Sequence, residues 1–292
     1  ARRFFGKTLN YYATTSLGNW RNTVTFVADD PDNPEEFALQ KGLDLITEEI
    51  DEKQPSFNIK KIYADAYQQE SSAGGELYPT VNEAINNAVE TGTLMLDYFG
   101  HGGEDGLSQE RIFDKINAQE LNNLNKLNCF VTVTCEFTKF DNPLRPTVGE
   151  YLYWNKNGGA ISLITTTRQI FISVGIQFST TLSQYLFDYN NTQNISMAEA
   201  LRLTKIDPSV TNSFQRRLVF YIGDPALKLP LAKPDIIVTK INDENITTSN
   251  LELQALSAAK IEGYVANEQG SILNNYSGTL KYYFLGVNSL KF

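Results

Sequence analysis

Two short apolar runs between Thr93 and Cys135 restrict the fold more than any other part of the sequence. The first, Thr93–Phe99, leads into a Gly-His-Gly-Gly turn at 100–103, and the second, Cys129–Cys135, is rich in Val and Thr. Short apolar runs that end at turn residues or charges are typical of buried strands in a parallel sheet. A helical segment at about 117–125 separates them, so the pattern predicts a strand–helix–strand crossover.

The two runs end in residues that suit nucleophilic catalysis. His101 is the only histidine of the chain, and Cys135 is one of two cysteines. Because the ends of adjacent parallel strands carry ligand sites, we expect both side chains at one edge of the sheet. An imidazolium favours the thiolate form of a nearby cysteine and then protonates the leaving amine. Each residue alone is equally well read as a core histidine or an inert thiol, but the two together predict a Cys–His dyad.

The glycines beside His101 suit the same chemistry. They let the backbone turn sharply and leave amide groups uncovered. The N–H groups of Gly102 and Cys135 are therefore the predicted donors to the oxyanion of a tetrahedral intermediate.

Bulk composition excludes several classes of function. The chain has 25 Lys and Arg against 34 Asp and Glu, and its net charge of −9 argues against nucleic acid as a partner. No run approaches the roughly 18 apolar residues of a membrane helix. The chain begins without Met or a signal peptide and is expected to be a fragment of a longer protein. Cys129 and Cys135, roughly 20 Å apart on one predicted strand, cannot form a disulfide.

Strands and helices alternate along residues 1–230, which predicts an α/β fold with a mainly parallel sheet flanked by helices. A proline-containing linker at 228–234 is followed by short alternating runs, which predict a small, incomplete β-sandwich. The predicted domains are therefore 1–230 and 231–292. In the first domain, further strands are expected at 20–28, 57–64 and 159–165, a polar loop at 67–77, and helices at 34–53, 78–92, 147–156, 175–189 and 196–206. In the second domain, strands are expected at 236–241, 250–255, 260–266 and 278–285.

Four features together resemble the gingipain-type cysteine peptidases. They are the strand into Gly100-His101-Gly102, the strand into Cys135, the segment Gly158–Ile161, and Gly223–Leu227 ahead of an immunoglobulin-like module. The resemblance implies a caspase-like α/β fold with a His/Cys dyad, followed by a partial immunoglobulin-like β-sandwich. Within the family, Trp20–Asp30 and Tyr98–Phe113 are most similar to the sortase of the type IX secretion system.

The resemblance also assigns roles to single residues. It makes Cys135 the nucleophile and His101 the general acid and base, with Gly102 in the oxyanion hole. An acid at the end of an earlier strand orients the imidazole in this family, and that position falls on Asp29, with Asp30 as the alternative. The run 29–32 reads equally well as a helix-capping or cation-binding turn. The dyad requires no cofactor, and a structural calcium ion is compatible with the resemblance.

Resemblance to the sortase implies removal of the C-terminal sorting signal from exported cargo proteins at the bacterial cell surface. Its expected partners are secretion-system components of the outer membrane, and a lipopolysaccharide amine is a candidate acceptor for the cargo. The alternatives are a plain gingipain-like endopeptidase and a non-catalytic docking module. The tryptophan-bearing segment of the secreted gingipains is replaced here by 103–107, so their specificity for basic residues is not expected. In this segment, Glu104 and Asp105 are candidates either for binding a substrate cation or for solvated loop carboxylates.

Overall fold

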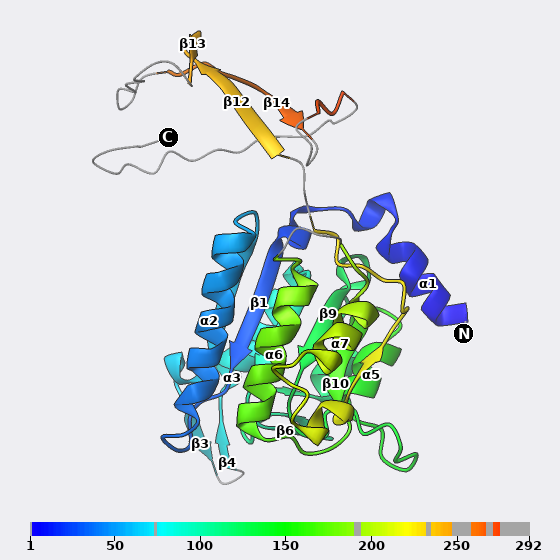
Figure 1. Ribbon diagram of the computed structural model, residues 1–292. Helices are drawn as coiled ribbons and strands as arrows, with labels where there is room; N and C mark the ends of the chain where they lie inside the picture. Colours follow the sequence, from blue (N-terminus) through cyan, green and yellow to red (C-terminus); the bar gives the residue numbers. More distant parts are fainter. Residues whose placement is uncertain are drawn as a thin grey trace. The chain divides into compact units, whose positions relative to one another are not determined.

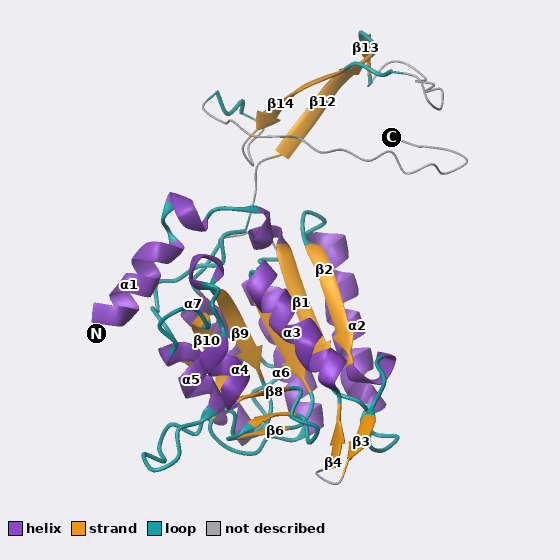
Figure 2. Ribbon diagram, turned by 180° about the vertical axis from the view of Figure 1, so that it is seen from behind, coloured by secondary structure: helices purple, strands orange, loops and turns teal. Residues whose placement is uncertain are grey.

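The computed structural model describes residues 2–72, 75–189, 194–231, 235–246, 258–266 and 271–274 (Figures 1 and 2). The chain divides into two compact units, Ala1–Leu231 and Ala232–Phe292, which are described separately. Within the described ranges, no helix has the length and apolar character needed to cross a membrane.

A six-stranded sheet forms the centre of the first unit, in the order β11-β10-β9-β5-β1-β2. Five of its strands are parallel to one another, and β11 runs antiparallel to β10. Every residue of β5, β9 and β10 is buried, which explains why these strands are apolar runs in the sequence. The predicted α/β fold with a mainly parallel sheet is therefore confirmed. The strands are β1 (Thr23–Ala28), β2 (Asn58–Tyr63), β5 (Met95–Phe99), β9 (Asn128–Thr132), β10 (Ala160–Thr166) and β11 (Val219–Ile222).

Helices cover both faces of this sheet. Apolar side chains of α2, α6 and α7 form a core on one face (Figure 1), and those of α3, α4 and α5 form a core on the other (Figure 2). In α2, for example, Leu39, Leu43, Ile46 and Ile50 are buried at the spacing of one helical face. The helices are α1 (Arg2–Tyr11), α2 (Phe37–Lys53), α3 (Pro79–Thr91), α4 (Lys115–Glu120), α5 (Val148–Trp154), α6 (Ile172–Leu186) and α7 (Met197–Ile206).

Two small antiparallel sheets lie at the carboxyl ends of the parallel strands (Figure 2). One is a hairpin of β3 (Glu70–Ser72) and β4 (Gly75–Leu77), where the sequence predicted a polar loop. The other contains β6 (Gly102–Gly103), β7 (Gly106–Leu107) and β8 (Phe113–Asp114). The residues after β5 therefore form ordered structure at the edge where a ligand site is expected.

Several predicted boundaries differ from the structure. The crossover helix begins at Lys115, earlier than predicted, because Asp114 and Asn117 form a capping box at its start. Strand β9 ends at Thr132, so Cys135 follows the strand and does not lie on it. Strand β11 was not predicted, because its few residues precede a turn-rich segment and carry no period of their own.

The second unit contains an antiparallel sheet in the order β13-β12-β14. Its strands are β12 (Asp235–Ile241), β13 (Glu244–Asn245) and β14 (Ile261–Ala266). The strands predicted at 250–255 and 278–285 lie outside the described residues. The immunoglobulin-like sandwich therefore stays a prediction.

Candidate active site

Three neighbouring strands end at the edge of the sheet that carries the candidate catalytic residues. Strand β5 lies between β1 and β9 and is parallel to both. Asp29 directly follows β1, His101 follows β5 after Gly100, and Cys135 follows β9 after a short turn. The crossover thus brings His101 and Cys135 to adjacent strand ends.

His101 and Cys135 line one cavity of about 80 Å³. The His101 side chain is 37 % exposed and Cys135 is partly buried, so both are accessible from solvent. The Cys135 thiol donates to the carbonyl of Ile170, with a sulfur–oxygen distance of 3.8 Å. Among the residues that the structure describes, no carboxylate lines this cavity, and most of the other lining side chains are apolar. The other side chains in the lining are those of Leu39, Tyr98, Phe99, Val133, Thr134, Ile170, Phe171, Ile172, Ile176 and Ser179.

A second cavity, of about 440 Å³, adjoins Cys135. It is lined by Glu136, Arg168, Gln169 and Phe214 together with the Ile170–Phe171 segment that also lines the first cavity. Cys135 therefore lines both a small, mostly apolar cavity and a wider cavity whose lining mixes polar and apolar side chains. The two cavities share Cys135 and the Ile170–Phe171 segment, so there is open space next to the sulfur.

The imidazole of His101 is held by Glu36. Its Nε2 lies 3.1 Å from Oε1 of Glu36, whose side chain is 6 % exposed. The prediction that Asp29 or Asp30 orients the ring is thus corrected. Asp29 lies at the strand end as expected, but its carboxylate faces the backbone of His101, and Glu36 reaches the ring from the start of α2.

Three groups hold the Glu36 carboxylate in place. Burial acts to raise the pKa of Glu36, but the hydrogen bonds from His101, the Asp32 N–H and Asn33 outweigh it, and the pKa is lowered. The Asp32 N–H donates to Oε2 at 2.8 Å, and the Asn33 side-chain amide donates to Oε1 at 2.5 Å. Glu36 is therefore ionised at neutral pH and can stabilise a cationic imidazole.

Asp29 fixes the backbone of the same loop. Its Oδ2 accepts from the His101 N–H at 2.9 Å and from the Tyr98 hydroxyl at 3.0 Å. Burial raises the pKa of Asp29 to about 7, and these two hydrogen bonds act in the opposite direction. Asp30 is instead bound by the hydroxyl of Tyr78, at 3.0 Å from its Oδ2.

The loops that carry His101 and Cys135 touch each other at Thr134. The Thr134 hydroxyl donates to the carbonyl of Gly100 at 2.5 Å, and the Thr134 carbonyl accepts from the hydroxyl of Thr166. A Cβ atom on Gly102 would lie 2.7 Å from Cγ2 of Thr134, so only glycine permits this approach. The predicted oxyanion donors, Gly102 and Cys135, lie on these two loops, and their role stays a prediction.

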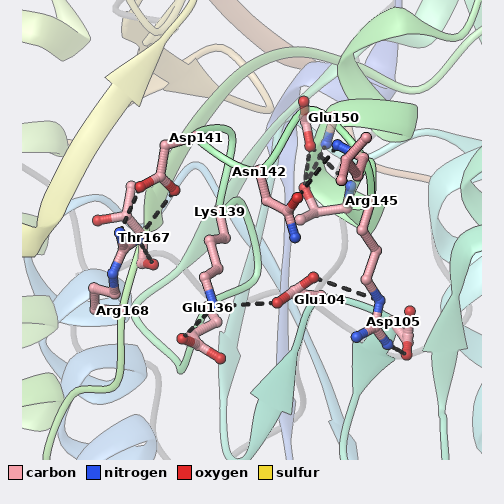
Figure 3. Close-up of polar contacts among 12 residues, drawn as sticks. Glu104, Asp105, Glu136, Lys139, Asp141, Asn142, Arg145, Glu150, Thr167 and Arg168 are labelled. Carbon is pink, nitrogen blue, oxygen red and sulfur yellow. Dashed lines mark hydrogen bonds and ion pairs between the residues drawn. The ribbon is translucent and has the colours of Figure 1, made fainter.

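Lys139 joins the same two loops by ion pairs (Figure 3). Its Nζ lies 3.2 Å from Glu104, which follows His101, and 3.1 Å from Glu136, which follows Cys135. Glu136 has a φ of 49°, a left-handed conformation that non-glycine residues seldom adopt. The ion pair therefore helps to hold an unusual backbone next to the candidate nucleophile.

The acidic loop after His101 is neutralised within the chain. Arg145 pairs with both Glu104 and Asp105 (Figure 3). Lys115 also pairs with Asp105, at 2.6 Å. Both carboxylates are thus engaged by cations of the chain itself, which argues against a role in binding a substrate cation. Glu104 is largely buried, so the alternative of a solvated loop carboxylate is wrong for it, whereas Asp105 lies on the surface with a side chain that is 49 % exposed.

Comparison with known proteins identifies the family. The model of peptidase family C25 matches residues 1–230, which is most of the chain. The chain belongs to this family. No curated protein sequence matches it.

Solved structures agree with the C25 assignment at the level of fold. The Arg-specific cysteine proteinase gingipain R has a TM-score of 0.62 and 16% identity over 81% of this chain and 55% of that chain. The complex of pro- and mature domains of Porphyromonas gingivalis RgpB has a TM-score of 0.61 and 16% identity, over 81% of this chain and 56% of that chain. A third structure, described as a protease, has a TM-score of 0.55 and 15% identity, over 82% of this chain and 55% of that chain. The chain thus spans about half the length of these three proteins, and the likeness shows the fold.

Sequence reasoning missed Glu36 in this C25 chain. It lies within the predicted helix 34–53, where a charged residue is usually solvated. In the structure it is the N-cap residue of α2 and is buried. The sequence did contain one indication: Glu36 is only four residues from the end of the acidic 29–32 run, so it must lie near the same strand end.

Proposed function

We propose that this chain carries the catalytic unit of a cysteine endopeptidase. The observation that supports this most directly is that His101 and Cys135 line the same cavity while Glu36 holds the imidazole. Because ionised Glu36 can only accept, Nε2 of the ring carries a proton and Nδ1 is the free base. In the proposed reaction, Nδ1 takes the thiol proton of Cys135, the sulfur attacks the scissile carbonyl, and the same proton passes to the leaving amine.

The thioester that results is resolved by a second nucleophile. Water gives a free acid, and an amine gives a new amide, with His101 accepting the proton in either case. We propose the sortase role: the enzyme cleaves the C-terminal sorting signal of exported cargo and transfers the cargo to an amine, with lipopolysaccharide as the candidate acceptor. It would act at the outer membrane surface with the secretion-system components located there.

The shape of the site supports this role over arginine-specific cleavage. The small cavity beside Cys135 is lined by apolar groups, and Glu104 and Asp105 are committed to internal ion pairs. A guanidinium would find no carboxylate there, and burying it unpaired would be costly. The wider cavity that Cys135 also lines offers space for an acceptor.

Mass spectrometry of a cleaved cargo tests the proposal. The chain is incubated with a cargo protein that ends in a sorting signal, with and without a small amine. The proposal predicts cleavage and incorporation of the amine at the new carboxyl terminus, both of which are lost in Cys135→Ala. Cys129→Ala, which changes the other cysteine, should retain both activities. A free acid as the only product at every amine concentration would leave a plain gingipain-like endopeptidase, and a lack of any cleavage would leave the docking module.

A further inference from the structure

We propose that Gln215 is a positioning residue that acts on Cys135 through the backbone of residues 169–171. These three residues, called the wall segment below, lie between β10 and α6. All three line the wider cavity beside Cys135, and Ile170 and Phe171 also line the small one. This role rests on the proposed function, because it concerns how the nucleophile of that function is held in place.

Gln215 binds the wall segment at two points. Its Oε1 accepts from the Phe171 N–H at 3.1 Å, and its Nε2 donates to the Gln169 carbonyl at 3.3 Å. A side-chain amide carries one acceptor and one donor group side by side, so it pairs with the segment as a neighbouring strand would. The opposite orientation of the amide would place donor against donor and acceptor against acceptor, so the two contacts fix its orientation.

The rest of the chain holds only the ends of this region. Before the wall segment, the Thr167 N–H donates to the Leu218 carbonyl at 3.1 Å, and at its end the Phe171 carbonyl accepts from the Gly175 N–H at 2.9 Å. Within the described ranges, Gln215 and Cys135 are the only residues whose side chains bind the backbone of the wall segment. The path of the backbone beside the sulfur therefore depends on Gln215.

The Ile170 carbonyl carries this constraint to the nucleophile. It lies between the two residues that Gln215 binds, and it accepts from the Cys135 thiol at a sulfur–oxygen distance of 3.8 Å. The hydrogen bond orients the sulfur at the small cavity that His101 also lines. Because a small misplacement of reacting groups is costly, a displaced carbonyl should slow the transfer of the thiol proton to His101.

Gln215 is itself firmly held. Its side chain is 6 % exposed, and its N–H donates to the Ser213 hydroxyl at 3.2 Å at the start of the 3₁₀-helix Phe214–Leu218. This helix leads directly into β11, which pairs with β10, and β10 precedes the wall segment. Both partners of the contact are thus anchored to the central sheet.

The first test removes both hydrogen bonds and nearly conserves size. In Gln215→Leu, the Phe171 N–H and the Gln169 carbonyl lose their partner, so we expect kcat for cargo cleavage to fall by about tenfold or more, with a smaller change in KM. Alkylation of Cys135 by iodoacetamide in the full chain should slow to a similar extent. Gln184→Leu, at an exposed glutamine of α6, is the matched control and should behave as the wild type.

The second test makes the contact depend on pH. In Gln215→Glu, a protonated carboxyl group can donate to the Gln169 carbonyl and accept from the Phe171 N–H, whereas a carboxylate can only accept. The rate of this variant relative to the wild type should therefore be near one in acid and fall about tenfold as the carboxyl group ionises, above a pH of about 4 to 5. Neither Gln215→Leu nor Gln184→Glu should show this pH dependence relative to the wild type.

The outcomes separate this role from the proposed function. Wild-type rates in Gln215→Leu, or a pH-independent ratio in Gln215→Glu, would overturn the positioning role and leave the proposed function standing. If Gln215→Leu does not fold, the pH profile of Gln215→Glu decides alone. A wild-type Cys135 that iodoacetamide alkylates no faster than free cysteine would contradict the proposed function and, with it, the role of Gln215.

Discussion

Oε1 of Glu36 lies 3.1 Å from Nε2 of His101, and this contact leaves Nδ1 as the ring nitrogen that would act on Cys135 in the proposed reaction. A carboxylate in this position both orients the imidazole and stabilises its cationic form. The contact joins the start of α2 to the residues after β5, so the docking of this helix on the sheet is part of the proposed catalytic geometry.

Replacing Glu36 by Gln should slow catalysis strongly. The amide can present its N–H₂ group to the ring and favour the wrong tautomer, so kcat should fall by about a hundredfold or more, with a smaller change in KM. Glu35→Gln, an exposed neighbour, is the matched control and should behave as the wild type. If Glu36→Gln leaves kcat unchanged and Asp29→Asn lowers it, the imidazole is oriented through the contact of Asp29 with the His101 backbone.

The Gly102 position should tolerate no side chain. In Gly102→Ala, the new Cβ would meet Thr134 at 2.7 Å and push apart the loops that carry His101 and Cys135. We expect kcat/KM to fall at least about tenfold, because small misplacements of reacting groups are costly. In Gly103→Ala, the new Cβ would have nothing within 4 Å, so near-normal activity is expected. Equal activities for the two variants would contradict the close contact.

Lys139 should act as a positioning residue. Removing its charge in Lys139→Met leaves Glu104 and Glu136 without their shared partner, and each pair is partly exposed. Pairs of this kind are weak because water and salt screen them, so we expect only a moderate fall in kcat, roughly three- to thirtyfold. Lys139→Arg should recover most of the loss, and added salt should reduce the difference between Lys139→Met and the wild type. Lys60→Met, at an exposed lysine on β2, is the control; an equal loss there would remove the special role of Lys139.

Asp97 should make the protein less stable as pH rises. It is buried in the middle of β5, its Oδ1 has no partner, and burial raises its pKa well above the usual value. The folded state therefore keeps a proton that the unfolded chain releases above a pH of about 4. The free energy of unfolding should fall by about 1.4 kcal/mol per pH unit between that pH and the folded-state pKa.

Asp97→Asn tests this linkage, since the amide cannot ionise. In denaturant unfolding, the free energy of unfolding of Asp97→Asn should not show this decline with pH. The stability of the variant relative to the wild type should therefore increase toward neutral pH. Asp51→Asn, an exposed acid, should leave the wild-type profile unchanged. Parallel profiles for Asp97→Asn and the wild type would show that Asp97 already ionises in the folded state or finds a partner.

The sheet was predictable because its buried strands are visible in the sequence as short, mostly apolar runs. Runs such as Met95–Phe99 and Ala160–Thr166 are buried along their whole length and are therefore mostly apolar, with Asp97 and three Ser and Thr residues as the exceptions. The crossover between β5 and β9 then requires His101 and Cys135 to lie at neighbouring strand ends. For the same reason, Asp29 was correctly expected at the same edge.

The contacts between side chains were not predictable in the same way. Asp29, Asp30 and Glu36 all lie near one strand end, and only the docking angle of α2 decides which carboxylate reaches the imidazole. The position of Cys135 beyond the end of β9 depends on side-chain hydrogen bonds from Thr134 and Thr166, which no periodicity reveals. The neutralisation of Glu104 and Asp105 likewise depends largely on Lys139 and Arg145, which lie more than thirty residues further along the chain.

The dyad is tested most directly by covalent labelling with a peptidyl ketone that alkylates cysteine nucleophiles. Intact and digested masses show how many labels are added and on which residue, and the rate shows whether His101 assists. We predict a single label on Cys135 and none on Cys129, which is buried and whose pKa burial raises to about 12. Labelling should slow by about a hundredfold or more in His101→Ala. Labelling of Cys129, or an unchanged rate in His101→Ala, would contradict the assignment of His101 and Cys135 as a catalytic pair.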